Sequence, residues 1–247
     1  MKKIVRGMGG VLLGLAMLPV TGAAADGSCV ACHKTVDAPA YVEHNFKDWE
    51  SSVHARAGVS CESCHGGDPA AQDKAKAHAG VIRSTAKNSP LYYTAIPESC
   101  GSCHQPELKA FKASVHYKQL HRTGQGPNCL TCHGSMASHV LAPRDMEMTC
   151  TLCHRRPTQA YVARLGLDEA ASAVKRLEKA IHQAKAAGTA SEGQERAYEE
   201  IAKLQRDASA DWHAFDMPKA IETAGRIRVR AAAALEEPGV KPKPTLP

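Results

Sequence analysis

The ten cysteines of this 247-residue chain form five copies of one motif, in which two cysteines are separated by two residues and followed directly by histidine. The copies are CVACH (Cys29, Cys32, His33), CESCH (Cys61, Cys64, His65), CGSCH (Cys100, Cys103, His104), CLTCH (Cys129, Cys132, His133) and CTLCH (Cys150, Cys153, His154). Such a motif attaches a c-type haem, because each thiol adds to one vinyl group of the porphyrin and the histidine binds the iron. The pattern therefore predicts five covalently bound haems c.

Three other uses of cysteine are compatible with parts of this pattern. Zinc sites also contain Cys-x-x-Cys pairs, redox-active dithiols contain one such pair, and exported proteins use cysteines in disulfides. None of these uses requires a histidine after every pair. Histidine makes up 13 of the 247 residues. The chance that a histidine follows all five cysteine pairs by accident, as the haem motif requires, is on the order of one in a million. We therefore adopt haem attachment.

Further histidines can fill the second axial position of each iron, which the motif histidine leaves open. From the local sequence we expect the second ligands to be His54, His116, His139, His78 and His213. His44 and His121 are then spare, and His182 is expected at or near the surface. A methionine ligand would raise the reduction potential relative to a histidine pair, and the available residues are Met136, Met146 and Met148.

An internal duplication places some of these histidines at equivalent positions. Residues 29–78 contain two motifs with WESSVH between them, and residues 100–139 contain two motifs with FKASVH between them. The shared Ser-Val-His ends at His54 in the first unit and at His116 in the second. Spacing to the next motif would instead favour His121, so this alternative stays open.

The segments that lead to His54 and His116 are expected to be helices. EHNFKDWESSVHA and PELKAFKASVHYKQLH lack internal Gly and Pro, and their apolar residues recur at steps of three and four. Such a helix could hold an imidazole at a fixed distance from a porphyrin ring.

Low aromatic content indicates that side chains alone do not form the core of the first half. The whole chain has three Phe, two Trp and six Tyr, and its first half is rich in Gly, Pro, Ser and His. Such a segment cannot easily bury enough surface to offset its chain entropy. We therefore predict a mainly α protein with a five-haem domain over residues 26–157, which has little regular structure around the haems.

The last third of the chain changes composition to Ala, Glu, Lys, Arg and Leu. Its apolar residues recur at helical spacing, and we expect an antiparallel helical hairpin or bundle over residues 158–236. The expected helices cover about 158–188, 192–215 and 218–236, and residues 237–247 are expected to form a disordered tail.

His213 lies near the end of the second of these helices, beside Trp212 and Phe215. We assign it to the haem of His154. The alternative role for the helices is a structural hairpin or a dimer surface.

The start of the chain has the three-part layout of a secretory signal peptide. MKKIVR is basic, VLLGLAMLPV is apolar, and AAA precedes an expected cleavage site after Ala25. Ten apolar residues are too few to cross a bilayer, which takes about 20. We therefore expect residues 1–25 to be a signal peptide and the mature chain to be periplasmic or otherwise exported.

The charge of the chain argues against nucleic acid as a partner. Loss of Lys2, Lys3 and Arg6 with the signal peptide lowers the formal net charge from +6 to +3. Each ferric haem with two ionised propionates adds about −1, since the charge of the cofactor must be counted. The loaded protein is then close to neutral.

With these motifs the chain resembles the multihaem cytochromes c of the nitrite reductase and hydroxylamine oxidoreductase superfamily, including the tetrahaem cytochrome that accepts electrons from hydroxylamine oxidoreductase. The resemblance rests on repeated CxxCH motifs with Ser-Val-His and CHG elements, followed by long helices, over most of residues 29–235. It implies haems stacked in near-parallel and perpendicular pairs, and carboxy-terminal helices that mediate a homodimer. The chain departs from the ammonia-forming pentahaem enzymes, because it has no CxxCK motif and is much shorter.

Two functions of different classes are compatible with these motifs. An iron with two protein ligands has no open position for substrate, so five such haems would form an electron carrier between redox partner proteins, or with a membrane quinol-oxidising complex. The alternative is a reductase of nitrite or hydroxylamine type with one open haem, that of His154 or His33. The available proton donors are His121, Tyr92, Tyr93, Arg122 and Arg144. The surplus of histidine favours the carrier.

Overall fold

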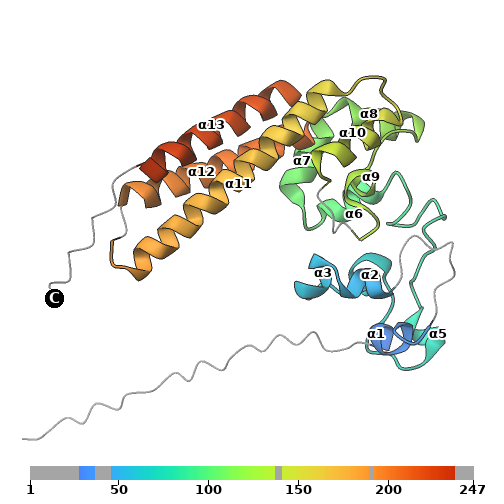
Figure 1. The fold of residues 1–247 in the computed structure, drawn as a ribbon. Helices are drawn as coiled ribbons and strands as arrows, with labels where there is room; N and C mark the ends of the chain where they lie inside the picture. The colour runs from blue at the N-terminus through green and yellow to red at the C-terminus, as the bar shows by residue number, and fades with distance from the viewer. Residues whose placement is uncertain (1–27, 37–45, 137–140, 190–191, 237–247) are drawn as a thin grey trace, which may run out of the picture.

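The computed structural model describes residues 28–36, 46–136, 141–189 and 192–236. Within these ranges all regular secondary structure is helical (Figure 1), and the predicted mainly α fold is confirmed. The predicted signal peptide and carboxy-terminal tail lie outside the described residues, as do His44 and His139. No helix within the described ranges is both long enough and apolar enough to cross a membrane.

Short helices carry the five cysteine motifs. None of these helices exceeds nine residues, and their bounds are α1 Ser28–His33, α2 Phe46–Glu50, α3 Val53–Arg56, α4 Glu62–His65, α5 Lys74–Ala77, α6 Ile96–Gly101, α7 Gln105–Ala113, α8 Val115–Thr123, α9 Cys129–His133 and α10 Pro143–Thr151. Turns and loops join them, and each motif lies within a helix or across its end. The motif histidines are therefore held on short, locally defined pieces of backbone.

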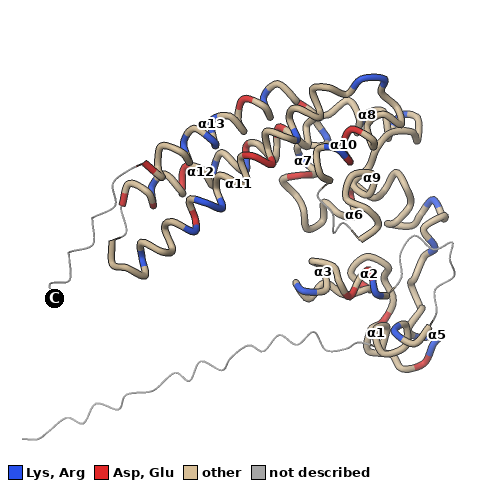
Figure 2. The backbone as a smooth tube through the Cα atoms, in the orientation of Figure 1, with Lys and Arg blue, Asp and Glu red and all other residues tan. Residues whose placement is uncertain are grey.

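Three long helices follow, namely α11 Thr158–Ala186, α12 Glu192–His213 and α13 Met217–Glu236. They run alternately away from the short helices, back toward them and away again (Figure 1). Leu177, Ile201 and Ile227, one from each helix, are almost fully buried between them, together with many alanines. Alanine keeps the helix axes close, and basic and acidic residues both recur along the three helices (Figure 2).

The long helices meet the short ones at one end only. Helix α10 packs against α11, and α7 packs against the end of α12. A small apolar cluster of Ala163, Met217 and Ala220 lies near this junction, with Trp212 and Phe215 packed against it. The carboxy-terminal part of α12 therefore lies directly beside the cysteine motifs.

Burial of apolar side chains differs sharply between the two parts. Among the described residues, fifteen buried apolar side chains belong to α11–α13, whereas five precede them. The five are Val30, Ile96, Phe111, Leu120 and Met146. So small a set cannot form a continuous core under ten short helices, which agrees with the expectation that a cofactor fills the interior of this part.

The helices expected before His54 and His116 are each interrupted, which corrects the prediction of one continuous helix. Ser52 separates α2 from α3, and Ser114 separates α7 from α8. Each serine is extended, is almost fully buried and accepts a hydrogen bond from a backbone N–H of the next helix, at 3.2 Å for Ser52 and 3.0 Å for Ser114. Serine is a preferred helix cap because its side chain satisfies an otherwise unpaired N–H group.

Candidate haem-binding sites

Four of the five motif histidines each face one histidine from outside the motifs. The ring-centroid separations are 6.1 Å for His33 and His78, 6.2 Å for His104 and His54, 6.2 Å for His133 and His213, and 5.8 Å for His154 and His116. The predicted ligand His139 lies outside the described residues, so the site of His65 is not part of this comparison. We number the sites I to V in chain order of their motifs.

These separations fit two imidazoles on opposite sides of one iron. A metal–imidazole bond is about 2 Å long and the ring centroid lies about 1 Å beyond the nitrogen, so the two centroids should be roughly 6 Å apart. Two aromatic rings in ordinary contact can also be separated by this distance. However, each of the four pairs joins one motif histidine to one other histidine, which ordinary contact does not require.

The zinc and disulfide alternatives find no support in the geometry. All ten cysteines lie within the described residues and none is in a disulfide. No three Cys, His, Asp or Glu side chains of the described residues converge as a bound metal ion would require. The residues therefore fit covalent haem better than they fit zinc.

Hydrogen bonds orient three of the four non-motif histidines. The Nδ1 atom of His78 lies 2.7 Å from the Lys74 carbonyl oxygen, that of His213 lies 2.7 Å from the Ser209 oxygen, and that of His54 lies 3.1 Å from the Met136 oxygen. A carbonyl only accepts, so Nδ1 must carry the proton and donate it. The lone pair is then on Nε2, which is the atom available to bind iron.

The Ser-Val-His element has a structural meaning that the sequence pattern alone did not reveal. The serine caps the helix, valine is its first residue and histidine is its second. Each histidine is therefore fixed on the first turn of a short helix. His54 lies between motifs I and II but faces motif III, and His116 lies between motifs III and IV but faces motif V. The same offset of two motifs occurs in both units, so that His54 links the first unit to the second and His116 links the second unit to motif V.

The assignment of His213 to the haem of His154 is wrong in this structure. His213 faces His133 with the rings nearly parallel, at an interplanar angle of 13°, and His154 faces His116 at 90°. The reason is the path of α12, which returns to pack against α7 and brings His213 to motif IV. Burial lowers the pKa of His213, and the Ser209 carbonyl and the charge of Glu107 oppose part of this shift.

His121 was the alternative to His116, and the structure separates their environments. The Nε2 atom of His121 lies 3.6 Å from a Glu98 carboxylate oxygen, and its ring lies 4.2 Å from that of Tyr117. The hydroxyl of Tyr117 donates to the same carboxylate. His121 therefore belongs to a polar cluster around Glu98, while His116 faces a motif histidine.

The three methionines considered as ligands also occupy distinct environments. Met146 is buried with its sulfur 3.7 Å from the Cys150 thiol, and Met148 is 58% exposed. Met136 contributes its backbone carbonyl to His54. None of these observations pairs a methionine with a motif histidine.

The five motifs are neighbours in chain order. Burial and the nearby Cys29 raise the pKa of Cys61, so motif I lies close to motif II. Burial and the nearby Cys100 and Cys103 raise the pKa of Cys64, so motif II lies close to motif III.

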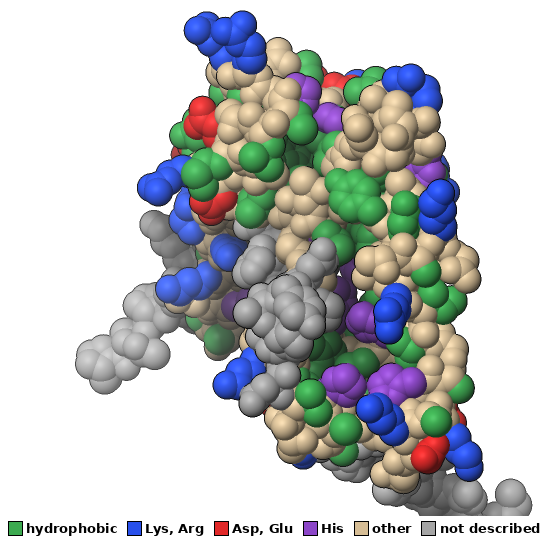
Figure 3. All heavy atoms as spheres, turned by 90° about the vertical axis from the view of Figure 1, so that its right-hand side faces the viewer, with side chains coloured by type: hydrophobic (Ala, Val, Ile, Leu, Met, Phe, Trp, Pro, Cys, Tyr) green, Lys and Arg blue, Asp and Glu red, His purple; other side chains and the backbone are tan. Residues whose placement is uncertain are grey.

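A hydrogen bond from the Cys100 thiol to Cys129 connects motifs III and IV. This bond raises the pKa of Cys100 and lowers that of Cys129. Burial and Cys150 raise the pKa of Cys132 to about 11, which joins motifs IV and V. Each motif therefore has a cysteine near a cysteine of the next motif, from motif I to motif V. Histidine side chains reach the surface at several places on the face shown in Figure 3.

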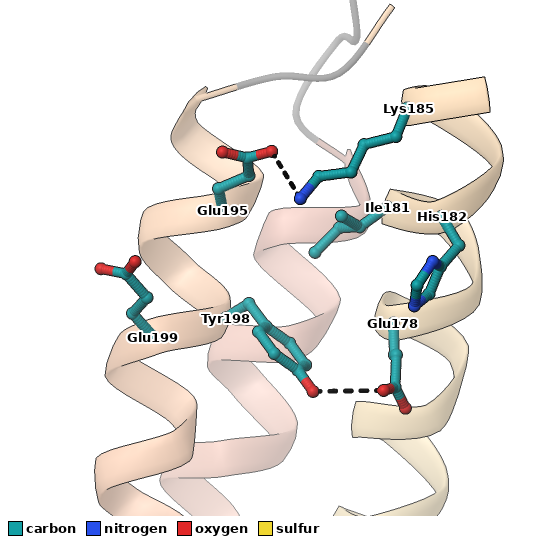
Figure 4. A pocket seen from close by; sticks show the side chains of 7 residues that line it. All are labelled: Glu178, Ile181, His182, Lys185, Glu195, Tyr198 and Glu199. Atoms are coloured by element: carbon teal, nitrogen blue, oxygen red, sulfur yellow. Dashed lines mark hydrogen bonds and ion pairs between the residues drawn. The ribbon is translucent and has the colours of Figure 1, made fainter. Parts of the chain in front are cut away.

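A pocket of about 190 Å³ lies away from the motifs, between α11 and α12 (Figure 4). It is lined by Glu178, Ile181, His182, Lys185, Glu195, Tyr198 and Glu199. Several of its polar groups are already paired, because Tyr198 donates to Glu178 at 3.3 Å and Lys185 lies 3.0 Å from Glu195. The exposed His182 matches the expectation of a surface residue, and the pocket has no contact with the haem motifs.

Comparison with known proteins shows that the chain is similar to multihaem c-type cytochromes. Residues 31–128 match the family model described as cytochrome c552. The chain is 29% identical over 164 residues to the C-type polyheme cytochrome OmcC of Geobacter sulfurreducens, which covers 53% of this chain and 20% of that protein. It is 30% identical over 135 residues to the multiheme cytochrome MtrA of Shewanella baltica, which covers 52% of this chain and 37% of that protein.

The matches support a multihaem c-type cytochrome. The chain covers only 20% and 37% of the length of these two relatives. No solved structure matches the chain. The narrower resemblance to the nitrite reductase and hydroxylamine oxidoreductase superfamily is not confirmed by these matches.

Proposed function

We propose that this protein carries electrons through five covalently attached haems c, each bound by two histidines. The observation that carries the proposal is the set of four histidine pairs, with ring centroids 5.8–6.2 Å apart, each of which includes a motif histidine. For the haem of His65 we propose His139, the remaining predicted ligand. When bound, each haem supplies one-electron Fe(III)/Fe(II) chemistry.

The protein would contribute position, ligands and environment to this chemistry. Thioethers from the motif cysteines would fix each haem to a short helix, and the second histidine would leave no position on the iron open to substrate. Adjacent motifs from I to V provide an order for electron steps, with motifs I and V as the two ends. Exposed and buried charges around each site would tune its potential.

A reductase function has less support from the geometry. The alternative requires one iron with an open position, and the sites nominated for it were those of His33 and His154. Each of these histidines faces a second histidine, His78 or His116. Turnover of nitrite or hydroxylamine with reduced viologen by the loaded protein would contradict the carrier proposal.

We further propose that the protein is exported after removal of residues 1–25, works in the periplasm and exchanges electrons with redox proteins or a membrane quinol-oxidising complex. The near-neutral charge of the loaded protein gives no reason for a nucleic-acid partner. A homodimer through α11–α13 is the proposed assembly, and sedimentation of the loaded protein would test it.

The central test combines mass and spin state. Protein matured in a host that attaches haem c should carry five haem masses and lack residues 1–25. Electron paramagnetic resonance of the oxidised protein should show only low-spin ferric haem. A smaller haem count, or a high-spin signal equal to one or more haems, would refute the proposal of five bis-histidine sites.

A further inference from the structure

Phe215 has an unusual backbone conformation in the turn between α12 and α13. Its φ is 61°, and it is the only non-glycine residue with positive φ in the described ranges. Its N–H donates to the Trp212 carbonyl at 3.0 Å, and the Asp216 N–H donates to the Asp211 carbonyl at 2.9 Å. These two bonds define a Schellman helix end, whose left-handed position is usually glycine because a side chain there is disfavoured.

The side chain of Phe215 makes contacts that glycine could not make. Its ring centroid lies 4.1 Å from that of His116 and 6.2 Å from that of Phe111, which is itself buried. Phe215 thus covers the imidazole that faces His154. A disfavoured backbone conformation that persists at a candidate cofactor site is a reason to look for a function.

His116 differs from the other paired non-motif histidines in its hydrogen bonding. Its Nδ1 atom is buried and has no hydrogen-bond partner. His54, His78 and His213 each place Nδ1 against a backbone carbonyl oxygen. Because His116 and His54 occupy equivalent positions in the duplication, both are expected to present Nε2 to the iron.

The missing acceptor affects the ligand strength of His116. A carbonyl that accepts the Nδ1 proton makes an imidazole a stronger electron donor and favours the ferric iron, which carries the extra positive charge. Without that acceptor, the ferric state gains less stabilisation and the potential rises. An apolar ring against the imidazole keeps out water, which would otherwise serve as the acceptor.

Burial alone does not distinguish site V from site IV, since His116 and His213 are both half-buried. The two sites differ in their polar neighbours. His213 has the Ser209 carbonyl and lies within the field of the Glu107 carboxylate. Both favour ferric iron at site IV, whereas the buried Nδ1 atom of His116 at site V has no hydrogen-bond partner.

We propose that Phe215 is a positioning residue that keeps the His116 imidazole dry and without a hydrogen-bond acceptor, and that site V consequently has the highest potential of the four paired sites. This inference rests on the proposed electron-carrier function. It gives the path a direction, because electrons that enter at sites I, III and IV are drawn to site V. Site V is therefore the end from which an acceptor would be served.

The test is a redox titration of the loaded protein followed by optical absorption. The component of site V is identified with His116→Met, because a methionine ligand raises the potential of its own haem. Phe215→Gly relieves the backbone and removes the ring, and Phe215→Leu keeps an apolar cover. Ile221→Ala loosens the same apolar cluster without removing the ring over His116.

We expect the component of site V to be reduced before those of sites I, III and IV. Phe215→Gly should lower this component alone by at least 59 mV, which is a tenfold change in a one-electron equilibrium. With Phe215→Leu, which keeps an apolar cover, the decrease should be at most half of that seen with Phe215→Gly. Ile221→Ala should leave the potential of site V unchanged. Paramagnetic resonance should stay low-spin in all three variants.

The inference is overturned if site V is not the first of these sites to be reduced. It is equally overturned if Phe215→Gly leaves the site V potential unchanged, or if Ile221→Ala lowers it as much as Phe215→Gly does. In each case low-spin spectra would leave the carrier proposal intact. A high-spin site V in the unmodified protein would instead refute the carrier proposal, so the two failures are distinguishable.

Discussion

Replacement of His213 by alanine tests the pairing of sites most directly. His213 is on the last turn of α12, its ring centroid lies 6.2 Å from that of His133, and the sequence alone had assigned it to His154. Alanine keeps the helix, because it has the highest helix propensity, and removes only the imidazole. If His213 is the second ligand of site IV, the variant leaves one iron with a single protein ligand.

The expected magnitude follows from the number of motifs. One of five haems should change from low-spin to high-spin, so one fifth of the ferric iron should give a high-spin resonance. The remaining four fifths should keep the spectrum of the unmodified protein. Added imidazole should restore the low-spin state, because it can occupy the emptied position. His182→Ala is the matched control, since His182 is an exposed histidine on α11 beside a separate pocket.

A second variant identifies which iron has lost its ligand. Replacement of Cys129 and Cys132 by alanine removes the haem of site IV. In that background His213→Ala should create no high-spin signal. A new signal in that background would show that His213 binds another iron and would refute the pairing described above.

Three further predictions concern the scaffold. Ile201→Ala, at a fully buried position, should lower the free energy of unfolding by about 2–5 kcal/mol in chemical denaturation, whereas Val229→Ala, at a position 72% exposed, should change it by less than about 0.5 kcal/mol. Gly67→Ala should make about one fifth of the iron high-spin in paramagnetic resonance. Gly67 has a φ of 93°, and a Cβ there would lie 2.5 Å from the carbonyl oxygen of Ala77, the residue before His78, which is the second histidine of site I. An unchanged spectrum would contradict this prediction. Burial and its hydrogen bond to Glu98 raise the pKa of Tyr117 to about 12, so its phenol should stay neutral at pH 11. Nuclear magnetic resonance of labelled tyrosine should show that Glu98→Gln lowers the pKa of Tyr117 toward 10. An unchanged pKa would exclude the Glu98 carboxylate as a cause.

The sequence predicted the parts of the structure that depend on local pattern. The three long helices follow from apolar spacing and a glycine, Gly188, whose φ of 68° ends α11. The choice of His116 over His121 followed from the shared Ser-Val-His element, and the structure places His116 opposite a motif histidine. Both results depend on residues that are close together along the chain.

The features that sequence analysis missed depend on how distant segments meet. Which motif His213 faces is decided by the packing of α12 on α7, and no spacing along the chain contains that information. The conformation of Phe215 also had no signal, because the residue usual at such a helix end is glycine. The serines before His54 and His116 did have a signal, since both were in the repeated element, but their role as caps required the hydrogen bonds.

The turn after α12 has a consequence for assembly in the cell. Translation and export both proceed from the amino terminus, so motifs I to V all become available before the segment that contains His213 and Phe215. If His213 is the second ligand of site IV, the coordination of that iron cannot be complete until the chain has been made through the end of α12. Until then it would be the place where stray oxygen or another small molecule could bind, and premature termination within α12 would leave a protein with this defect.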